Sequence, residues 1–215
     1  DGGAGSDTLQ LSAGSHVFNS DSNFSNIETV LTNASGSSVN LSAQTEGFTI
    51  TGGAGVDIIT GGAGVDIIAG GGGNDQLTGG GGVDTFKIDA GSDTITDLSA
   101  TDIMVVSSGA IANATISANY TAAGTTTNAG TANLTLGTGG LTVNMNLAGG
   151  SAGFNLIGSS GTDTITGTGK ADTFTIASSG HGNSDVLDGG AGTDTLQLSA
   201  GSHVFSSDSN FSNIE

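Results

Sequence analysis

Residues 52–87 read GGAGVDIIT, GGAGVDIIA, GGGGNDQLT and GGGGVDTFK, which are four nine-residue rows without a gap. Each row opens on glycines, reaches an aspartate at its sixth position and has an apolar side chain two residues later. One apolar side chain in every nine residues does not follow the 3.6-residue period of an α-helix. The stretch instead predicts short strands that are separated by tight glycine turns.

The aspartates keep this spacing beyond the glycine-rich rows. Six of them lie nine residues apart: Asp57, Asp66, Asp75, Asp84, Asp93 and Asp102. The residue two positions after each of them is always apolar: Ile59, Ile68, Leu77, Phe86, Ile95 and Met104. A second, poorer run follows the same rule at Asp163, Asp172, Asp185 and Asp194, and Asp7 repeats the last of these at the start of the chain. We therefore predict an interior built from one apolar side chain per row.

The beginning of the chain returns at its end. Residues 1–28 and 188–215 differ only at Ser6/Thr193 and Asn19/Ser206. This overlap predicts a tandem array with a repeat of 187 residues, of which the chain is one window. The function of such an array usually depends on its length, spacing and surface, and seldom on one pocket.

The composition favours β-structure and an acidic surface. The chain has 40 glycines, no proline, no cysteine and a formal net charge of -18, and 17 of its 20 acidic residues are aspartate. Such a surface repels nucleic acids and acidic membranes, and no stretch is apolar enough to span a bilayer. We expect no nucleic-acid partner and no membrane insertion. Hard divalent cations are the expected partners, because carboxylates and backbone carbonyls are their preferred ligands.

The GGxGxDxUx rows resemble the nonapeptide of the RTX family, secreted bacterial proteins whose calcium-binding β-rolls carry this motif. The resemblance implies an all-β, right-handed parallel β-roll or β-helix solenoid with calcium-binding nonapeptide coils that forms around several Ca²⁺ ions. Two rows make one coil, so residues 18 apart should stack. Asp57 should then share an ion with Asp75, and Asp66 with Asp84. Loop carbonyls would complete these two sites: those of Gly53, Gly55, Gly62 and Gly64.

Other rows depart from the motif. Asp75 with Asp93 and Asp84 with Asp102 are further candidate pairs, and the candidate metal ligands also include Asp163, Asp172, Asp185, Asp194 and Asp7. Lys170 occupies the fourth-glycine position of its row, where an ammonium group would oppose or replace an ion. We expect some of these rows to keep only the hydrophobic stack. The alternative for every row is that aspartate simply ends turns well.

Four segments follow from these patterns. Residues 47–104 are the predicted calcium β-roll, and residues 158–215 are a degenerate second run that continues into the next repeat. Residues 1–46 and 105–157 are rich in Ser, Thr and Asn with period-two apolar patterning, which is typical of half-buried strands. In the second of these segments we predict alternation through Leu134, Leu136, Leu141, Val143, Met145 and Leu147, and a loop over residues 121–131. No helix is expected.

The sequence predicts a mechanical role: a calcium-stiffened repeat of a large bacterial surface protein. The pattern resembles S-layer proteins, long adhesins and surface filaments, which implies type I secretion and an extracellular location. The expected partners are neighbouring repeats of the same protein, and self-association into a filament or lattice is a hypothesis that follows from the strand ends at both ends of the window. One alternative is a glycan- or ice-binding adhesin repeat, because Thr60, Thr78 and Thr96 lie 18 apart, although Ala69 and Lys87 break the opposite file. Another is the tail of a secreted enzyme.

We expect no catalysis within the chain. His16 and His203 occupy the same repeat position, and His181 stands alone. Neither arrangement supplies a nucleophile, a base and an orienting group, or several convergent zinc ligands.

Overall fold

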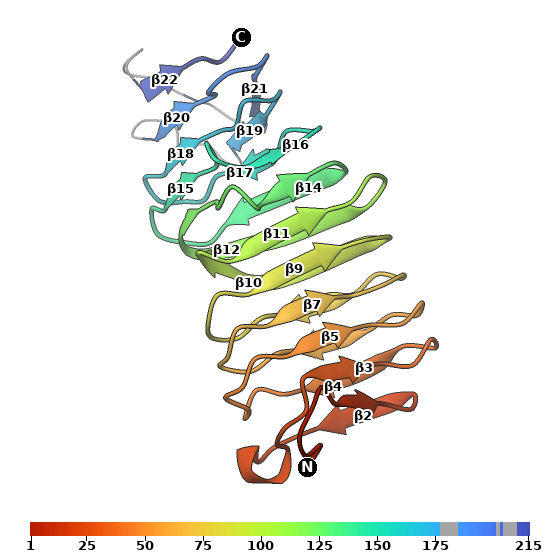
Figure 1. Cartoon of the computed structure of the whole chain (residues 1–215). Helices are drawn as coiled ribbons and strands as arrows, with labels where there is room; N and C mark the ends of the chain where they lie inside the picture. The colour runs from red at the N-terminus through yellow and green to blue at the C-terminus, as the bar shows by residue number, and fades with distance from the viewer. Residues whose placement is uncertain (177–184, 201–202, 204–209) are drawn as a thin grey trace.

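The computed structural model describes residues 1–176, 185–200, 203 and 210–215 of the chain. It is a β-solenoid in which all described strand pairings are parallel, and the chain climbs from the N-terminal to the C-terminal end in successive coils (Figure 1). The described part contains one short 3-10 helix, η1 (Asp21–Asn23), and no α-helix. No described helix has the length and apolar character that a membrane-spanning segment requires. The all-β solenoid predicted from the rows is confirmed.

The strands lie in two sheets, of which the second branches. Sheet A consists of β1 (Thr8–Gln10), β3 (Thr29–Leu31), β5 (Thr49–Thr51), β7 (Ile67–Ala69), β9 (Thr85–Ile88), β11 (Ile103–Val106), β13 (Thr127–Asn128) and β16 (Gly149–Gly150). The main path of sheet B consists of β2 (Gly14–Val17), β4 (Ser37–Asn40), β6 (Ile58–Thr60), β8 (Gln76–Thr78), β10 (Ser92–Ala100), β12 (Ile111–Thr121), β14 (Thr131–Leu136), β17 (Asn155–Ile157), β19 (Thr173–Ile176) and β21 (Thr195–Leu198). The branch of sheet B consists of β15 (Thr142–Asn144), β18 (Thr164–Thr166), β20 (Val186–Asp188) and β22 (Phe211–Ser212).

One coil in the glycine-rich region takes two rows. In sheet B Ile58 pairs with Gln76, and Gln76 pairs with Thr94. In sheet A Ile67 pairs with Thr85. Each step is 18 residues, because a row supplies one strand and one turn and two rows are needed to return to the same sheet. The predicted stacking of residues 18 apart is therefore confirmed.

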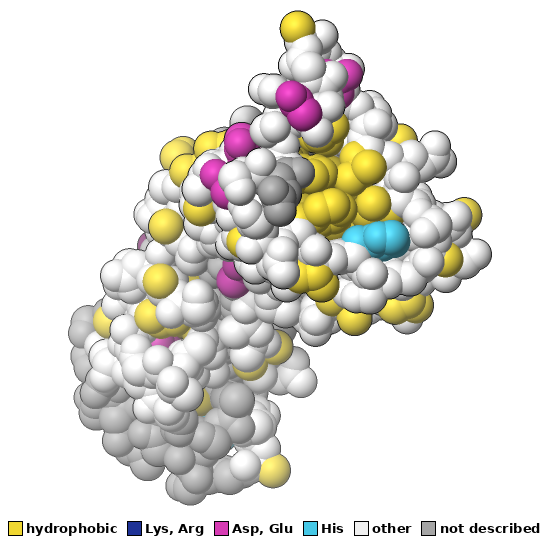
Figure 2. All heavy atoms as spheres, turned by 90° about the horizontal axis from the view of Figure 1, so that it is seen from below, with side chains coloured by type: hydrophobic (Ala, Val, Ile, Leu, Met, Phe, Trp, Pro, Cys, Tyr) yellow, Lys and Arg dark blue, Asp and Glu magenta, His cyan; other side chains and the backbone are white. Residues whose placement is uncertain are grey.

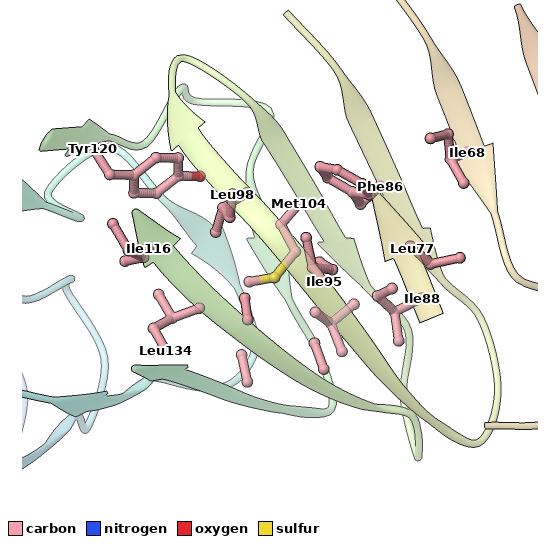
Figure 3. Packing of buried hydrophobic residues seen from close by; sticks show 14 of the residues in the cluster. Ile68, Leu77, Phe86, Ile88, Ile95, Leu98, Met104, Ile116, Tyr120 and Leu134 are labelled. Carbon is pink, nitrogen blue, oxygen red and sulfur yellow. The ribbon is translucent and has the colours of Figure 1, made fainter. Parts of the chain in front are cut away.

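The interior is the predicted apolar stack. The six apolar residues of the regular rows are all fully buried: Ile59, Ile68, Leu77, Phe86, Ile95 and Met104. Figure 3 shows five of them packed between the ribbons of the two sheets, in a column that continues to Ile116 and Leu134. Successive side chains of a β-strand point to opposite faces, so a buried residue is followed or preceded by an exposed one. Ile58, directly before Ile59, is accordingly 47 % exposed.

In the middle of the chain, stacked asparagine side chains stabilise the solenoid. Asn133 donates its side-chain N–H to Oδ1 of Asn113 at 2.9 Å, and Asn155 donates to Oδ1 of Asn133 at 2.7 Å. These asparagines occupy consecutive strands of sheet B, so their amides form a ladder along the solenoid. The ladder continues the stack where no glycine-rich row is present.

Two details of the predicted middle segment are wrong. Leu147 is 64 % exposed, since it follows the end of β15 and turns away from the interior, whereas Leu134, Leu136, Val143 and Met145 are buried as predicted. The segment 121–131 is not one loop, because it contains the short strand β13, which pairs with Val105 and Val106 of β11. Thr and Asn at that position gave no apolar alternation from which a strand could be predicted.

Candidate metal centre

The predicted ligand aspartates line the turns that enter the strands, and they are buried. Ten of them are at most 4 % exposed: Asp57, Asp66, Asp75, Asp84, Asp93, Asp102, Asp163, Asp172, Asp185 and Asp194. Asp7, at the uncovered N-terminal end of the solenoid, is only partly buried. Ionised carboxylates are costly to bury without a hydrogen-bonding or cationic partner, so this row of acids requires an explanation.

Part of the explanation is a hydrogen-bonded ladder. The Oδ1 atom of Asp75 accepts the backbone N–H of Asp57 at 2.8 Å, and Oδ1 of Asp84 accepts that of Asp66 at 2.9 Å. The ladder continues in the same way: Oδ1 of Asp93 accepts the N–H of Asp75, and Oδ1 of Asp102 accepts that of Asp84, both at 2.9 Å. It also appears in the second run, in which Asp185 accepts from Asp163 at 2.9 Å and Asp194 accepts from Asp172 at 2.7 Å. All the predicted aspartate pairs are thus direct neighbours along the solenoid.

The second carboxylate oxygen has two kinds of environment. Oδ2 of Asp57 accepts the N–H of Gly53 at 2.9 Å, and Oδ2 of Asp66 accepts that of Gly62 at 2.8 Å. By contrast, Oδ2 is buried without a hydrogen-bond partner in four ladder members: Asp7, Asp75, Asp93 and Asp194. A buried carboxylate oxygen without a partner is the group that a bound cation would satisfy. In Asp75, Asp93 and Asp194 the turn interpretation therefore accounts for Oδ1, which accepts a backbone N–H, but not for Oδ2.

The predicted carbonyl ligands face the loop of the following coil. The carbonyl of Gly53 accepts the N–H of Gly72 at 2.8 Å, and that of Gly62 accepts the N–H of Gly81 at 2.9 Å. The carbonyls of Gly55 and Gly64 point at Gly73 and Gly82 in the same way, close enough that an added Cβ would clash. The loops that are two rows apart therefore stack in register on top of one another.

The opening glycine of each row is required by the aspartate of the same row. A Cβ on Gly61, Gly70 or Gly79 would collide with Oδ2 of Asp66, Asp75 or Asp84, respectively. The motif thus couples its first and sixth positions through a steric contact, which explains why glycine opens the regular rows.

Among the described residues, no group of three or more acidic or histidine side chains converges in a way that would hold a metal ion. A cation site here would therefore draw on two carboxylates and on loop carbonyls, which is a donor set that suits Ca²⁺. Lys170 is exposed, and its carbonyl approaches Gly192, in the place that a glycine carbonyl has in the regular rows. The effect of its ammonium group on an ion remains a prediction.

Two acidic residues with related roles were missed by the sequence analysis. Asp97 accepts the N–H of Gly79 at 2.9 Å and that of Gly80 at 2.8 Å, and Glu28 accepts the N–H of Asp7 at 2.8 Å. Asp97 lies 18 residues after Gly79, which was a usable signal, although it occupies a glycine position of its row. Glu28 continues the ladder at a spacing of 21, which no nine-residue period could reveal.

The histidines show no comparable arrangement. Nε2 of His16 lies 2.9 Å from the carbonyl oxygen of Ser12, and Nε2 of His203 lies 3.0 Å from that of Ser199. The two copies thus make the same local backbone contact. His181 lies outside the described residues.

Burial raises the pKa of the ladder carboxyls. Desolvation raises the pKa of Asp84 to about 7 and that of Asp93 to about 6. The charge of Asp66 adds to the shift of Asp84, and the charge of Asp75 adds to that of Asp93. The pKa values of Asp66, Asp75, Asp102 and Asp172 are also raised, with desolvation as the main cause. In their ionised form these six carboxyls therefore oppose folding unless a cation compensates them.

This predicts opposite pH dependences with and without calcium. A carboxyl whose pKa is higher in the folded state than in the unfolded state favours folding below its unfolded pKa, and this contribution is lost as the pH rises through the folded value. In EDTA, the free energy of unfolding should therefore increase as the pH falls from 8 to 5. In calcium it should decrease over the same range, because protons compete with the ion. Far-UV circular dichroism follows the folded fraction in EDTA at each pH, and denaturant titrations give the free energy of unfolding in calcium. Asp84→Asn should flatten the slope in EDTA more than the exposed control Glu46→Gln, and equal slopes in the two variants would contradict the assignment.

The positive-φ glycines give a second prediction. Gly73 has φ 125°, and a Cβ on it would lie 2.5 Å from the carbonyl oxygen of Gly55, whereas a Cβ on the neighbouring Gly72 would meet nothing closer than 3.6 Å. Gly73→Ala should therefore destabilise the roll by about 1–3 kcal/mol and weaken calcium binding. Gly72→Ala should do neither, since Ala54 and Ala63 already occupy that position in other rows. Thermal unfolding in calcium compares the two variants. Similar melting temperatures would show that the loop geometry is not required.

The comparisons with known proteins agree with this geometry. The model of the RTX calcium-binding nonapeptide repeat matches four times, over residues 51–86, 60–95, 157–175 and 179–202. No curated protein and no solved structure matches the chain. The matched segments contain the glycine loops and most of the buried aspartate ladder. These segments are therefore RTX calcium-binding nonapeptide repeats.

Proposed function

We propose that this chain is a calcium-dependent structural repeat of a large extracellular protein, and that it folds and stiffens when Ca²⁺ binds to its turns. The observation that carries the proposal is the set of buried carboxylate oxygens without a hydrogen-bond partner in Asp75, Asp93 and Asp194, which lie in segments that match a calcium-binding repeat. The net charge of -18 points the same way, because so acidic a chain resists compaction without counterions.

The residues that would hold the ions are those of the stacked turns. Asp57 with Asp75, and Asp66 with Asp84, would supply the carboxylates, and the loop carbonyls of Gly53, Gly55, Gly62 and Gly64 would supply the neutral oxygens. A bound Ca²⁺ supplies positive charge that offsets both the desolvation of these carboxylates and their mutual repulsion. In such a chain the binding free energy becomes folding free energy.

A structural role is supported by the form of the molecule. Its interior is filled by apolar side chains along the whole solenoid, and no pocket is present among the described residues. The stacked coils make a rod in which each coil contacts only its neighbours, so that length can be added repeat by repeat. We accordingly propose a non-enzymatic role at the bacterial cell surface, with secretion by the type I route, in an S-layer, a filament or an adhesin stalk.

The threonine file gives less support to glycan or ice binding. Thr60 and Thr78 are register partners in sheet B, and Oγ1 of Thr78 lies 2.7 Å from Oγ1 of Thr96. These last two hydroxyls therefore bond to each other along the file. The file on sheet A contains Ala69 and Lys87 as partners, so the two sheets do not form matching binding faces.

The testing experiment is a calcium titration of the EDTA-treated chain, followed by far-UV circular dichroism and small-angle X-ray scattering. We expect a cooperative gain of β-signal at calcium concentrations on the order of 10⁻⁴–10⁻³ M, which is the range of extracellular calcium modules. The scattering should change from that of an expanded coil to that of a rod. A rod already present in EDTA, with no change on adding calcium, would refute calcium-dependent folding.

A further inference from the structure

The two copies of the repeated segment have the same local conformation at opposite ends of the solenoid. The equivalent backbone angles φ agree closely: 92° and 88° at Gly3 and Gly190, 130° and 139° at Gly5 and Gly192, and 53° and 52° at Asn26 and Asn213. The hydrogen bond to a glutamate recurs as well: the backbone N–H of Asp7 donates to Oε2 of Glu28 at 2.8 Å, and that of Asp194 donates to Oε2 of Glu215 at 2.9 Å. The segment therefore keeps its described shape, whichever neighbour covers it.

Each copy has the neighbour that the other lacks. The C-terminal copy stacks on a preceding coil, where Thr195 pairs with Thr173 and Oδ1 of Asp194 accepts the N–H of Asp172 at 2.7 Å. The N-terminal copy stacks under a following coil, where Thr8 pairs with Thr29. The exposed fractions change accordingly: Leu11 is 7 % exposed and its equivalent Leu198 is 42 % exposed.

The uncovered N-terminal end is apolar. Figure 2 looks at this end and shows a group of hydrophobic side chains beside a histidine. Leu9, Phe18 and Ile27 pack there against the core but remain only partly buried. The C-terminal copy shows what covers this surface, since β21 carries the same sequence as β1 and docks on β19. The partner that fits the N-terminal end is therefore the coil 155–176 of another copy of the repeat.

The equivalent first strands of the two copies do not lie in the same sheet. Strand β1 belongs to sheet A, whereas its equivalent β21 belongs to sheet B. The change occurs where β12 extends over eleven residues and pairs with both β14 and β15, which starts the branch. Sheet A then ends at β16, and the chain goes on alternating between sheet B and the branch (Figure 1).

We propose that consecutive repeats form one uninterrupted solenoid in which sheet B of each repeat continues as sheet A of the next, so that neighbouring repeats are related by roughly half a turn about the solenoid axis. Strands in the two sheets of a roll run in opposite directions, so exchanging the sheets reverses the orientation of the repeat. A face that sheet A presents on one side in one repeat is presented on the opposite side in the next. This inference extends the proposed structural role, and it rests on the proposal that the repeats form a rod.

The test uses a two-repeat chain: residues 1–215 followed directly by a second copy of residues 29–215. Since the natural chain has no cysteine, pairs of spin labels can be attached at introduced cysteines and their distances measured by pulsed electron paramagnetic resonance. One pair joins Thr135→Cys of the first repeat to Thr49→Cys of the second. The matched pair joins Thr135→Cys to Ile58→Cys of the second. Thr49 and Ile58 are exposed on sheets A and B, respectively.

In calcium, the first pair should give a narrow distribution near about 25 Å, because the two residues are five strands apart in one continuous sheet at about 4.8 Å per strand. The second pair should be longer by roughly 10 Å or more, since its labels lie on opposite faces of the roll. The reverse order would show that each sheet continues as itself, and broad distributions for both pairs would show a flexible junction. Either result overturns the inference. Narrow distances in the same order that persist in EDTA would uphold the junction and refute only the calcium proposal.

Discussion

Replacing Asp75 with asparagine is expected to change the stability of the protein in opposite directions with and without calcium. The amide oxygen of Asp75→Asn can still accept the N–H of Asp57, so the hydrogen bond of the ladder is kept. The substitution removes a carboxylate whose pKa is raised by desolvation and by the charge of Asp57, so the calcium-free fold should become more stable. It also removes one anionic ligand from two adjacent candidate sites.

In calcium the same variant should be less stable than the natural chain. The calcium concentration at the midpoint of folding should rise about tenfold or more, because ligand charge sets the affinity of such sites. Calcium titrations measure the midpoint of folding, and the residual far-UV β-signal in EDTA measures the stability of the calcium-free fold. Glu46→Gln removes one charge at an exposed position and serves as the control. A loss of stability in both conditions would mean that Asp75 acts only through the turn. A gain in both would mean that it binds no ion.

The second large effect concerns the apolar stack. Ile59→Ala should lower the free energy of unfolding by about 2–5 kcal/mol, because the side chain is fully buried and its removal leaves a cavity between the two sheets. Ile58→Ala makes the same chemical change one residue earlier, on the outer face of β6, where the side chain is 47 % exposed. Its cost should stay below about 1 kcal/mol.

Denaturant unfolding in saturating calcium compares the two isoleucine variants. Since each coil contacts only its neighbours, the effect of Ile59→Ala should be largest for the coils next to β6. Hydrogen exchange resolved along the chain would show this as lost protection in β4 and β8, with little change in β19. Equal costs for the two variants would contradict the assignment of the inner and outer faces.

The sequence determined much of this protein because its period is local and strict. Nine residues with glycines first, an aspartate sixth and an apolar residue eighth alternate a turn with a short strand. The stack of Ile59, Leu77 and Ile95 follows from that spacing alone. The same spacing places Asp57 next to Asp75, since two rows close one coil.

The tertiary structure decided what the period does not encode. The exposure of Leu147 and the strand β13 depend on which coil lies next to them, and their own residues carry no signal of it. The positions of Asp97 and Glu28 in the ladder depend on contacts 18 and 21 residues away. Which aspartates have an oxygen without a partner depends on the loop conformation, which differs between rows of nearly identical sequence.

The sheet exchange is the clearest case. Residues 1–28 and 188–215 are nearly identical, so no local rule distinguishes them, and yet their equivalent strands β1 and β21 lie in different sheets. Their placement is set by how many strands the intervening chain forms and by the long strand β12, which opens a second column. Local residue order thus determines the coil and its turns, whereas the order in which coils accumulate determines the path of the rod.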